Sequence, residues 1–509
     1  MHNRLTPISL STLLSTWVDI TPSNILISGM TLDSRKILKD NLFVALQGSS
    51  LDGRVFIDKA IMLGASAVLS ETKVAAEHGS LCYKDSVPVI SIYQLSQILS
   101  QLAYQFYFPE QGLHKVIAVT GTNGKTTIAS LLANCFSLLG KSSAQMGTIG
   151  NGLFGHLQSS LNTTLDAISV FSELYAYQQQ QVDYTIMEVS SHGLSQGRVT
   201  AVPFYSAIFT NLTRDHLDYH GTMDAYRAAK KRLFQEYPVT HRIINAEDNT
   251  GLTWLNDFPD GIGYGIAEQH FVNNTPFLQV TNIEYLAQGI HFEFSSPWGA
   301  GKISAPFYGD FNVSNLSAVA SQLLAENISV QEIEAIFPKL TCVPGRMEQY
   351  AFSEQQVTFV VDYAHTSDAL EKALIALQKH KSSGRLVCLF GCGGDRDKGK
   401  RPEMAKIAEL FSDQVILIDD NPRSEDPSEI MKDVLAGFSD PSVVLNIHDR
   451  QEAVRFALEN SLPGDIVLLA GKGHEDYQII GNTRIHYSDR ELLASLQDKY
   501  NKVNNEEDV

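Results

Sequence analysis

Apolar and polar positions follow one another along this chain in a pattern that predicts strands and helices in turn. Apolar runs of strand length, such as "KVIAVT" at 115–120 and "IVLLA" at 466–470, are followed by glycine-rich turns or by segments with helical spacing. This alternation is typical of α/β units built around largely parallel sheets. The longest apolar runs are too short to cross a bilayer. We therefore predict an α/β fold without membrane insertion.

The pattern also divides the chain into three blocks. The first block contains "NLFVALQG", "SAVLSE" and "VPVISI", and the amphipathic segment "LSQILSQLAYQFYF" leads into the second. The turn-rich stretch "TCVPGRMEQ" near residue 340 indicates another boundary. A chain of 509 residues exceeds what one hydrophobic core usually serves. We predict three α/β domains, at 1–93, 94–339 and 340–509.

Composition and charge narrow the classes of partner. The chain has 39 Lys and Arg against 57 Asp and Glu, a net charge of −18, which disfavours a sequence-independent grip on nucleic acid or on an anionic membrane. Five scattered cysteines are typical of reduced thiols, and Cys388 and Cys392, without a second pair nearby, do not predict a metal site. Pro7 and its hydroxyl neighbours replace the apolar stretch of a signal peptide. A cytoplasmic monomer is expected.

The stretch "VIAVTGTNGKTTIASLLANCF" predicts a nucleotide site. A strand ends at Thr120, and a glycine-containing loop precedes an amphipathic helix. Backbone N–H groups of such a loop cradle phosphates, Lys125 can reach the β- and γ-phosphates, and the Thr126 hydroxyl can bind Mg²⁺. Val119 stands where the general pattern has its first glycine. The alternative is an ordinary glycine-rich turn. The predicted ATP-binding residues here are Gly121, Thr122, Asn123, Gly124, Lys125, Thr126 and Thr127.

Polar side chains follow two further strands. "DYTIMEVSSHGL" places Glu188 at the carboxyl end of a strand, where ligands of open α/β sheets bind and where Mg²⁺ would find a carboxylate. The alternative for Glu188 is a solvated strand end. "SAIFTNLTRDHLDYHG" leaves its strand into a loop dense with polar groups, among them His216. These residues predict an enzyme that uses Mg²⁺ and ATP.

Several motifs together resemble the Mur ligase family. They are "TGTNGKTT", "MEVSSHGL", "FTNLTRDHLDYHG", "YRAAK", "DFNVSN", "PGRME", "DYAHTSDAL", "GDRDKGKR", "DNPR" and "GKGHE", and "LDSR" extends the match into the first block. The resemblance implies a UDP-binding N-terminal domain, a central P-loop ATPase-type parallel sheet and a Rossmann-like C-terminal domain that brings the amino acid. It implies an ATP-dependent amide ligase of peptidoglycan precursor synthesis that extends UDP-N-acetylmuramoyl-L-alanyl-D-glutamate through an acyl phosphate.

The resemblance also implies residue roles. Glu188 and His216 are expected to bind Mg²⁺ with Thr126. Asn312, Arg346 and Asp362 match positions that serve ATP, and His365 lies in the same motif. The expected contacts to the muramoyl-peptide are Ser34, Thr163, Thr164, Ser190, Gln196 and Arg198. Ser49 and Ser50 stand where relatives often carry His-Gln, a departure at the uridine contacts.

Lys230 of "YRAAKKRLF" has two interpretations. As one of three basic residues on a helix, it would by default lie on a solvated face. In the Mur ligase family the matching lysine carries CO₂ as a carbamate, an anion that can face Mg²⁺ where an ammonium would repel it. The "YRAAK" context leads us to expect that modification here, with a catalytic role for Lys125, Glu188, His216 and Lys230.

The string "DNPR" bears on the choice of amino acid. It resembles the signature of members that add meso-diaminopimelate, a substrate whose far end carries a carboxylate that an arginine fork can bind. Arg423 would repel the bare ammonium of L-lysine. Its alternative is a surface ion pair with Glu425 or Asp426. The expected diaminopimelate residues are Arg396, Asp420, Asn421, Pro422, Arg423, Gly471 and Glu475.

Three other functions stay open at this point. The L-lysine-adding ligase of the same step shares most of these motifs. A folylpolyglutamate synthase-like ligase shares the phosphate loop, although it is not expected to carry "DNPR". A nucleotide-switched binding protein would consume ATP without forming an amide.

Overall fold

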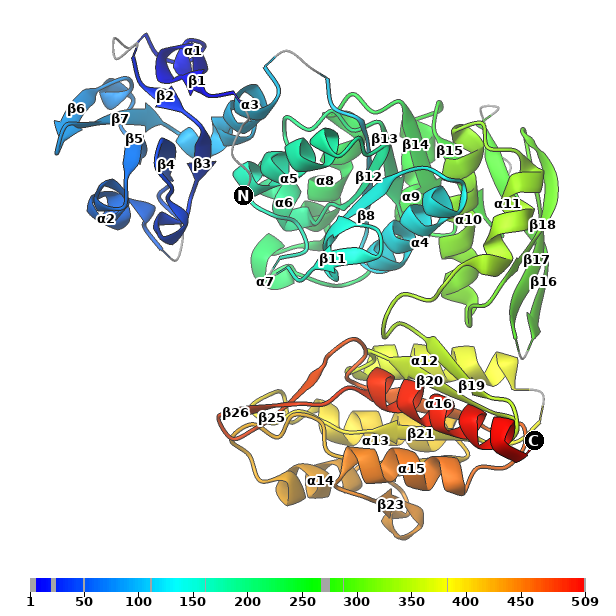
Figure 1. The fold of residues 1–509 in the computed structure, drawn as a ribbon. Coiled ribbons are helices and arrows are strands. Elements are labelled where there is room, and N and C mark those ends of the chain that lie inside the picture. The colour runs from blue at the N-terminus through cyan, green and yellow to red at the C-terminus, as the bar shows by residue number, and fades with distance from the viewer. Residues whose placement is uncertain are drawn as a thin grey trace. The chain divides into compact units, whose positions relative to one another are not determined.

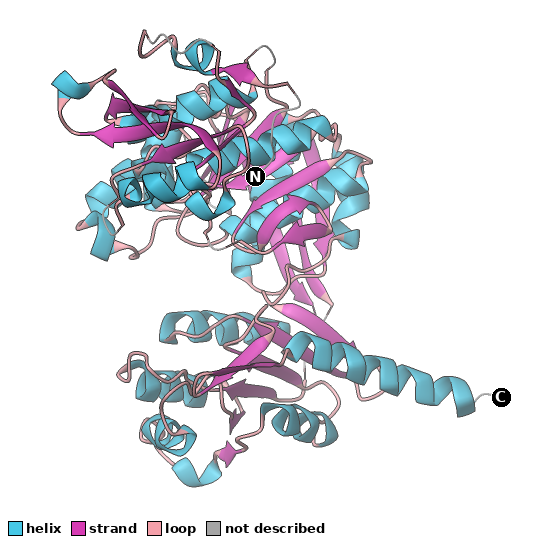
Figure 2. Ribbon diagram, turned by 60° about the vertical axis from the view of Figure 1, so that its left-hand side comes forward, coloured by secondary structure: helices cyan, strands magenta, loops and turns pink. Residues whose placement is uncertain are grey.

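The computed structural model describes residues 6–19, 24–48, 51–109, 112–160, 162–266, 275–286, 288–381 and 383–507 (Figure 1). Ser49 and Ser50 lie outside these ranges. Helices alternate with strands through the chain, as the sequence predicts (Figure 2). The fold class is α/β, and no helix of the described residues is long and apolar enough to span a membrane.

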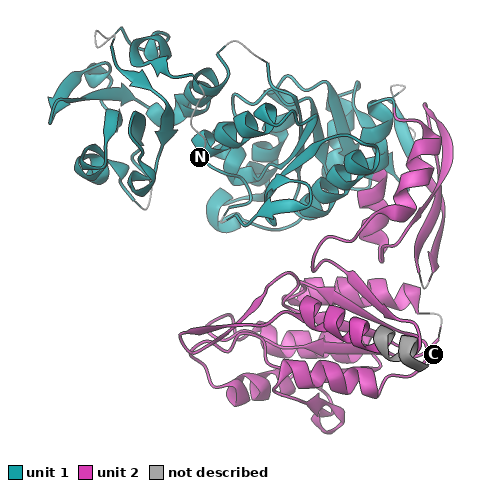
Figure 3. Cartoon of the chain, viewed as in Figure 1, with its two compact units in different colours: residues 1–278, 318–327 teal, residues 279–317, 328–509 magenta. Residues whose placement is uncertain are grey.

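The chain divides into two compact units (Figure 3). Unit 1 comprises residues 1–278 and 318–327, and unit 2 comprises 279–317 and 328–509. The predicted domain boundaries at 93/94 and 339/340 are a finer division than these units and stay a prediction.

The N-terminal part of unit 1 is built on a five-stranded sheet in the order β3-β4-β5-β7-β6, parallel except for β6 against β7. The strands are β3 (Gly29–Thr31), β4 (Asn41–Ala45), β5 (Ala65–Thr72), β6 (Leu81–Lys84) and β7 (Val87–Tyr93), and a short pair joins β1 (Ile8–Ser9) to β2 (Leu26–Ile27). The helices are α1 (Leu10–Leu14), α2 (Ile57–Met62) and α3 (Leu95–Tyr107). The amphipathic pattern of α3 buries seven of its residues, among them Leu99 and Phe106.

The rest of unit 1 holds strands in the order β11-β10-β9-β12-β8-β13-β14-β15, parallel from β9 to β15. They are β8 (Lys115–Thr120), β9 (Ser143–Gly147), β10 (Gly150–Leu153), β11 (His156–Gln158), β12 (Tyr184–Glu188), β13 (Ser206–Phe209), β14 (His241–Asn245) and β15 (Ile262–Gly265). The helices are α4 (Lys125–Leu138), α5 (Ala167–Gln179), α6 (Ser191–Ser195), α7 (Leu217–His220), α8 (Met223–Gln235) and α9 (Asn249–Asp257). Strands β8 and β12 are almost wholly buried, as expected for central parallel strands.

Unit 2 begins with the antiparallel strands β16 (Phe277–Leu286), β17 (Gly289–Ser296) and β18 (Gly299–Ala305). Helix α10 (Asp310–Ala325) contributes residues to both units, and α11 (Val330–Ile336) follows with a capping box at Ser329 and Glu332. The capping box satisfies two backbone donors at the helix start.

The C-terminal sheet of unit 2 has the order β19-β20-β24-β21-β22-β23, parallel except for β19. Its strands are β19 (Glu348–Phe352), β20 (Val357–Asp362), β21 (Leu386–Phe390), β22 (Gln414–Leu417), β23 (Leu445–Asn446) and β24 (Ile466–Ala470), and β25 (Tyr477–Ile480) pairs with β26 (Thr483–His486) as a hairpin. The helices are α12 (Ser367–His380), α13 (Lys400–Phe411), α14 (Pro427–Leu435), α15 (Arg450–Glu459) and α16 (Asp489–Glu507). Loops at the carboxyl ends of the parallel strands carry the predicted amino-acid residues.

Candidate active site

The phosphate loop of unit 1 connects β8 to α4. Gly121 and Gly124 have φ of 149° and 85°, conformations that favour glycine, and a Cβ on Gly121 would lie 1.8 Å from Thr210 Oγ1. Lys125 Nζ donates to the carbonyls of Gly121 and Thr122 at 2.9 and 2.8 Å. Glycine is therefore required for this turn between β8 and α4, and Lys125 is folded back over the loop.

The segment that follows β13 forms several hydrogen bonds with the phosphate loop. Asn211 Oδ1 accepts from the Asn123 N–H at 2.9 Å, and Thr210 Oγ1 donates to the Asn123 carbonyl at 2.6 Å. Thr122 Oγ1 accepts from the Thr213 N–H at 3.0 Å. The polar residues after β13 thus fix the phosphate loop as well as lining the region around it.

Glu188 lies at the end of β12 and is fully buried, so the solvated alternative is wrong. Its carboxylate accepts from the Thr126 hydroxyl at 2.9 Å and from the Thr148 N–H at 2.8 Å. Burial raises the pKa of Glu188, and the nearby Lys125 ammonium opposes that rise. A Cβ on Gly147 would lie 2.1 Å from Glu188 Oε1, so the neighbouring strand must carry glycine for the carboxylate to fit. Thr148 is a contact that sequence reasoning missed.

Lys230 is buried, with 1% of its surface exposed, which makes the solvated-face interpretation wrong. Its Nζ donates to the Gly121 carbonyl at 2.9 Å and lies 4.7 Å from the centre of the Tyr226 ring. Burial lowers the pKa of Lys230 well below its ordinary value, and the Lys125 ammonium lowers it further. The helical spacing of Tyr226, Lys230 and Leu233 on the buried face of α8 is the signal that identifies this position.

His216 lies in the left-handed region, with φ of 52°, immediately before α7. Its ring is 4.9 Å from that of His192 and 6.0 Å from that of Tyr226, measured between centres. Tyr226 donates or accepts a hydrogen bond with Thr122 Oγ1 at 3.1 Å, which connects α8 to the phosphate loop. His216 therefore lies near Tyr226, a residue that contacts the phosphate loop.

The predicted muramoyl-peptide residues of the central sheet form one connected group. Thr164 Oγ1 donates to the Glu188 carbonyl and is 3.0 Å from Ser190 Oγ, which caps α6. Arg198 donates to the Thr164 carbonyl at 2.6 Å and to Gln196 Oε1 at 2.6 Å. Thr163 Oγ1 is 3.1 Å from the Thr148 hydroxyl. Ser34, by contrast, lies in the N-terminal part of unit 1, buried at the start of a 3₁₀ turn.

The remaining predicted ATP residues belong to unit 2. Asn312 is buried near the start of α10 and donates to the Tyr308 carbonyl at 2.8 Å. Asp362, at the end of β20, accepts from the backbone N–H groups of Met347 and Ala364, both at 2.9 Å. Burial raises the pKa of Asp362 against the opposing effect of Arg346. His365, in the same motif, is exposed.

The "DNPR" loop follows β22 and is anchored by its backbone. The Arg423 N–H donates to the Ile479 carbonyl at 3.0 Å, and its carbonyl accepts from Gly481 at 2.7 Å, so the loop pairs with the β25–β26 hairpin. The guanidinium donates to the Gly394 carbonyl at 2.8 Å. Glu425 instead binds Arg401 and Lys398, and Asp426 caps α14. Within the described ranges no ion pair includes Arg423, so the surface-pair alternative is wrong.

The other predicted amino-acid residues surround this loop. Asn421 is buried, and its Nδ2 donates to Glu475 Oε2 at 3.2 Å. Burial raises the pKa of Glu475, and Asp420 raises it further. Gly471 has φ of 113° at the end of β24. Arg396 is exposed on the loop before α13.

Two structural details bear on metals. Cys388 and Cys392 are free and buried, and burial raises the pKa of both thiols. Among the described residues no three His, Cys, Asp or Glu side chains form a metal-binding group. Of the predicted Mg²⁺ ligands, Glu188 and His216 are side chains of these types, and Thr126 contributes a hydroxyl.

Comparisons with known proteins cover most of the chain. Family models described as "Mur ligase family, catalytic domain", "Mur ligase middle domain" and "Mur ligase, glutamate ligase domain" match residues 26–107, 119–323 and 345–473. A UDP-N-acetylmuramoyl-L-alanyl-D-glutamate–2,6-diaminopimelate ligase of Haemophilus influenzae is 48% identical over 93% of this chain and 97% of its own length. A ligase of the same name from Vibrio parahaemolyticus is 46% identical over 96% and 98%.

Solved structures agree with these matches. A structure of a UDP-N-acetylmuramoyl-L-alanyl-D-glutamate–2,6-diaminopimelate ligase is 35% identical, with a TM-score of 0.74 over 97% of this chain and 99% of that one. Mycobacterium tuberculosis folylpolyglutamate synthase complexed with ADP is 16% identical, with a TM-score of 0.58 over 74% of this chain and 91% of that one. The second likeness shows a shared fold alone.

Proposed function

The chain belongs to the Mur ligase family, and we propose that it joins meso-diaminopimelate to UDP-N-acetylmuramoyl-L-alanyl-D-glutamate in peptidoglycan precursor synthesis. The ligase consumes ATP and forms an amide bond, ADP and phosphate. One observation carries the proposal: relatives with that substrate in their names are 46–48% identical over more than nine-tenths of the chain. An Arg423 guanidinium without a carboxylate partner in the described ion pairs supports the choice of amino acid.

The chemistry requires activation of a carboxylate, which is a poor electrophile. The D-glutamate γ-carboxylate attacks the γ-phosphate of ATP, and ADP leaves. The incoming amine then attacks the carbonyl carbon of the acyl phosphate, the amide N–C bond forms, and phosphate and a proton are released. The protein contributes mainly positioning and charge neutralisation. Lys125 is suited to neutralise the transferring phosphate, because its Nζ already lies over the loop within 2.9 Å of two loop carbonyls.

Mg²⁺, when bound, would neutralise negative charge that develops on the phosphates. We assign its protein ligands to Thr126, Glu188, His216 and a carbamylated Lys230. The Thr126 hydroxyl and the Glu188 carboxylate fit as neighbouring donors, because they are 2.9 Å apart. An unmodified Lys230 ammonium does not fit, since it would add a second cation beside Lys125.

The environment of Lys230 favours the modification. Formation of a carbamate requires a neutral amine: the nitrogen attacks CO₂, an N–C bond forms and a proton is released. Burial beside Lys125 lowers the pKa of Lys230 and so increases the neutral fraction. The product carries negative charge where the unmodified side chain carried positive charge.

Substrate contacts are assigned to the groups that the sequence predicts. Asn312, Arg346 and Asp362 are assigned to ATP, as are the residues of the phosphate loop. Ser34, Thr163, Thr164, Ser190, Gln196 and Arg198 hold the UDP-muramoyl-dipeptide. Arg396 and Arg423 take the far carboxylate of diaminopimelate, and Gly471 and Glu475 face its ammonium. Asn421 adds amide hydrogen bonds, Asp420 contributes a further contact to diaminopimelate, and Pro422 stiffens the loop. We expect a cytoplasmic monomer that binds no nucleic acid.

The test is phosphate release from ATP in the presence of the UDP-muramoyl-dipeptide, with meso-diaminopimelate or L-lysine offered in parallel. Release and a product mass that depend on diaminopimelate are expected. Equal or better use of lysine would retain the ligase and overturn the assignment of Arg423. Release without an amide product would favour a nucleotide-switched binding protein.

A further inference from the structure

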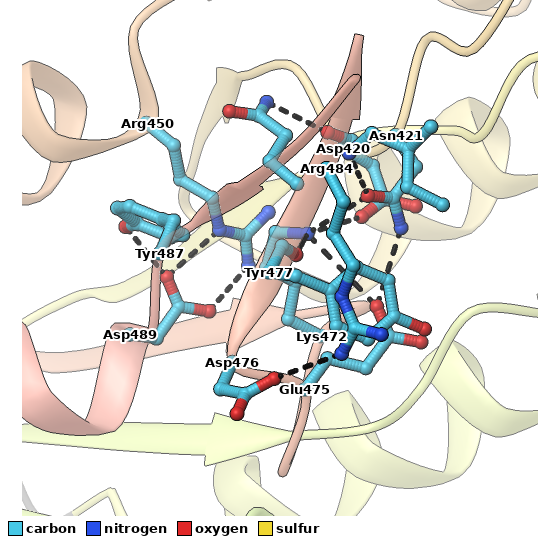
Figure 4. A network of polar contacts seen from close by, with 12 residues as sticks. Asp420, Asn421, Arg450, Lys472, Glu475, Asp476, Tyr477, Arg484, Tyr487 and Asp489 are labelled. Carbon is cyan, nitrogen blue, oxygen red and sulfur yellow. Dashed lines mark hydrogen bonds and ion pairs between the residues drawn. The ribbon is translucent and has the colours of Figure 1, made fainter. Parts of the chain in front are cut away.

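Lys472 is a buried cation among the residues assigned to the diaminopimelate ammonium. Its side chain is fully buried, and its Nζ lies 3.4 Å from Asp420 Oδ1 and 3.9 Å from Glu475 Oε2. Nζ also donates to the Tyr477 carbonyl at 2.7 Å and to Asn421 Oδ1 at 3.3 Å (Figure 4). An ammonium that binds Glu475 must therefore share this carboxylate, and the neighbouring Asp420, with a cation that the protein itself supplies.

Among the described residues, the other charged side chains nearby pair with one another and do not form ion pairs with Lys472. Arg450 and Asp489 form a buried bidentate pair at 2.8 and 2.7 Å, and Tyr487 donates to Asp489 at 2.8 Å (Figure 4). Arg484 pairs with Asp476 in an exposed position and stacks on the Tyr477 ring at 3.8 Å. Lys472 thus forms its ion pairs with two carboxylates, Asp420 and Glu475.

Asp420 has a carboxylate oxygen that can accept a hydrogen bond from a further donor. Asp420 Oδ1 is buried and accepts no hydrogen bond from the described residues, because Lys472 approaches it as an ion pair without hydrogen-bond geometry. Burial lowers the pKa of Lys472 while Asp420 raises it, so the ammonium form depends on that carboxylate. Two carboxylates and one internal cation leave a single negative charge for the substrate.

We propose that Lys472 determines which amino acid the protein accepts. Its positive charge beside Asp420 and Glu475 disfavours a substrate whose far end carries only an ammonium. The inference rests on the proposed function. The far end of diaminopimelate carries an ammonium and a carboxylate and has no net charge, whereas that of L-lysine carries one positive charge. A fixed cation within about 4 Å of the shared carboxylates disfavours lysine and changes the binding of the zwitterionic end much less.

The test compares kcat/KM for meso-diaminopimelate and for L-lysine in four proteins: wild type, Lys472→Met, Lys472→Met with Asp420→Asn, and Asp420→Asn alone. Lys472→Met is expected to lower the ratio of diaminopimelate to lysine about tenfold or more. The double variant restores the net charge and should return the ratio toward that of the wild type. Asp420→Asn alone should move the ratio in the opposite direction.

A merely structural role predicts a different result, namely equal losses for both amino acids in Lys472→Met and no recovery in the double variant. That result overturns the inference. Lys472→Gln repeats the charge change with a different shape, and Lys432→Met, an exposed lysine on α14, should leave the ratio unchanged. If the wild type uses neither amino acid, the proposed function fails; if it uses diaminopimelate and the ratios stay constant, only the role of Lys472 fails.

Discussion

Single residues in this protein are held by contacts of both the backbone and the side chain, as Arg423 illustrates. Arg423 uses its backbone to pair with the β25–β26 hairpin and one guanidinium nitrogen to bind the Gly394 carbonyl. Its φ of 52° places it in the left-handed region, and Pro422 before it restricts the loop further. The backbone is therefore fixed by contacts that a change of the side chain leaves in place.

Substituting Arg423 tests that arrangement. Arg423→Met should lower kcat/KM for diaminopimelate about a hundredfold or more, because a carboxylate left without its partner in a buried site costs on the order of 3–5 kcal/mol. Use of L-lysine should stay the same or rise. Arg484→Met, at an exposed neighbour on the hairpin, is the matched control and should leave both activities near those of the wild type.

Lys230 provides a second test at this scale. Lys230→Arg keeps a positive charge but cannot form a carbamate, so turnover should fall by about a hundredfold or more if the anion holds Mg²⁺. Lys231→Arg is the control, because Lys231 is the next residue on α8 and pairs with Asp257 at 2.7 Å. Near-normal turnover in Lys230→Arg would refute the carbamate. A ¹³C signal from labelled bicarbonate, present in the wild type and absent from Lys230→Arg, checks the modification directly.

Two loops of the C-terminal sheet are joined to each other beside the predicted amino-acid site. Asp395, next to Arg396, accepts from the Ser424 hydroxyl at 2.6 Å, and the Asp395 N–H donates to Glu425 at 2.6 Å. Glu425 also accepts two hydrogen bonds from the buried Arg401, at 2.9 and 3.0 Å. The loops that carry Arg396 and Arg423 are thus held together through Glu425.

Glu425→Gln should loosen this connection. We expect a higher KM for diaminopimelate, by about tenfold, with a smaller change in kcat, because the two arginines lose their fixed separation. The Glu429→Gln variant, in an exposed i,i+3 pair on α14, should show neither effect. An unchanged KM in Glu425→Gln would show that the loops keep their positions without this carboxylate.

The same variant has a predicted dependence on pH. Hydrogen bonds from Arg401 lower the pKa of Glu425 from 4.5 to about 2. A carboxyl whose pKa is lower in the folded state stabilises the fold above its unfolded pKa, and this contribution is lost as the pH falls through the folded pKa. The difference in Tm between wild type and Glu425→Gln should therefore be largest above pH 4.5 and shrink toward pH 2, as thermal unfolding at several pH values would show.

At the scale of the whole molecule, nucleotide binding should appear as stabilisation of the folded chain. A ligand that binds only the folded state contributes about 2.7 kcal/mol at one hundred times its Kd. For a unit of this size that corresponds to a rise in Tm of roughly 4 °C. Differential scanning calorimetry with Mg²⁺ and ATP should show the rise in the wild type and a much smaller one in Lys125→Met. Equal shifts in both would place the nucleotide elsewhere than the phosphate loop.

The sequence determined those features that depend on short stretches of chain. The alternation of apolar runs and helical spacing is local, so the α/β class could be predicted from it. The phosphate loop is likewise one continuous segment, in which the spacing of Gly121, Gly124 and Lys125 sets the backbone conformation. The Mur ligase motifs are also short strings, and the comparisons confirm the family that they indicated.

Only the tertiary structure decided which polar groups are buried and which residues they contact. Basic neighbours made Lys230 resemble a solvated residue, whereas packing of α8 places it against the phosphate loop, 109 residues away along the chain. Lys472 stands between two glycines and gave no local signal, yet it contacts Asn421 across 51 residues. The burial and pairing of charged side chains depend on elements that are distant in sequence. Local periodicity therefore does not predict those contacts.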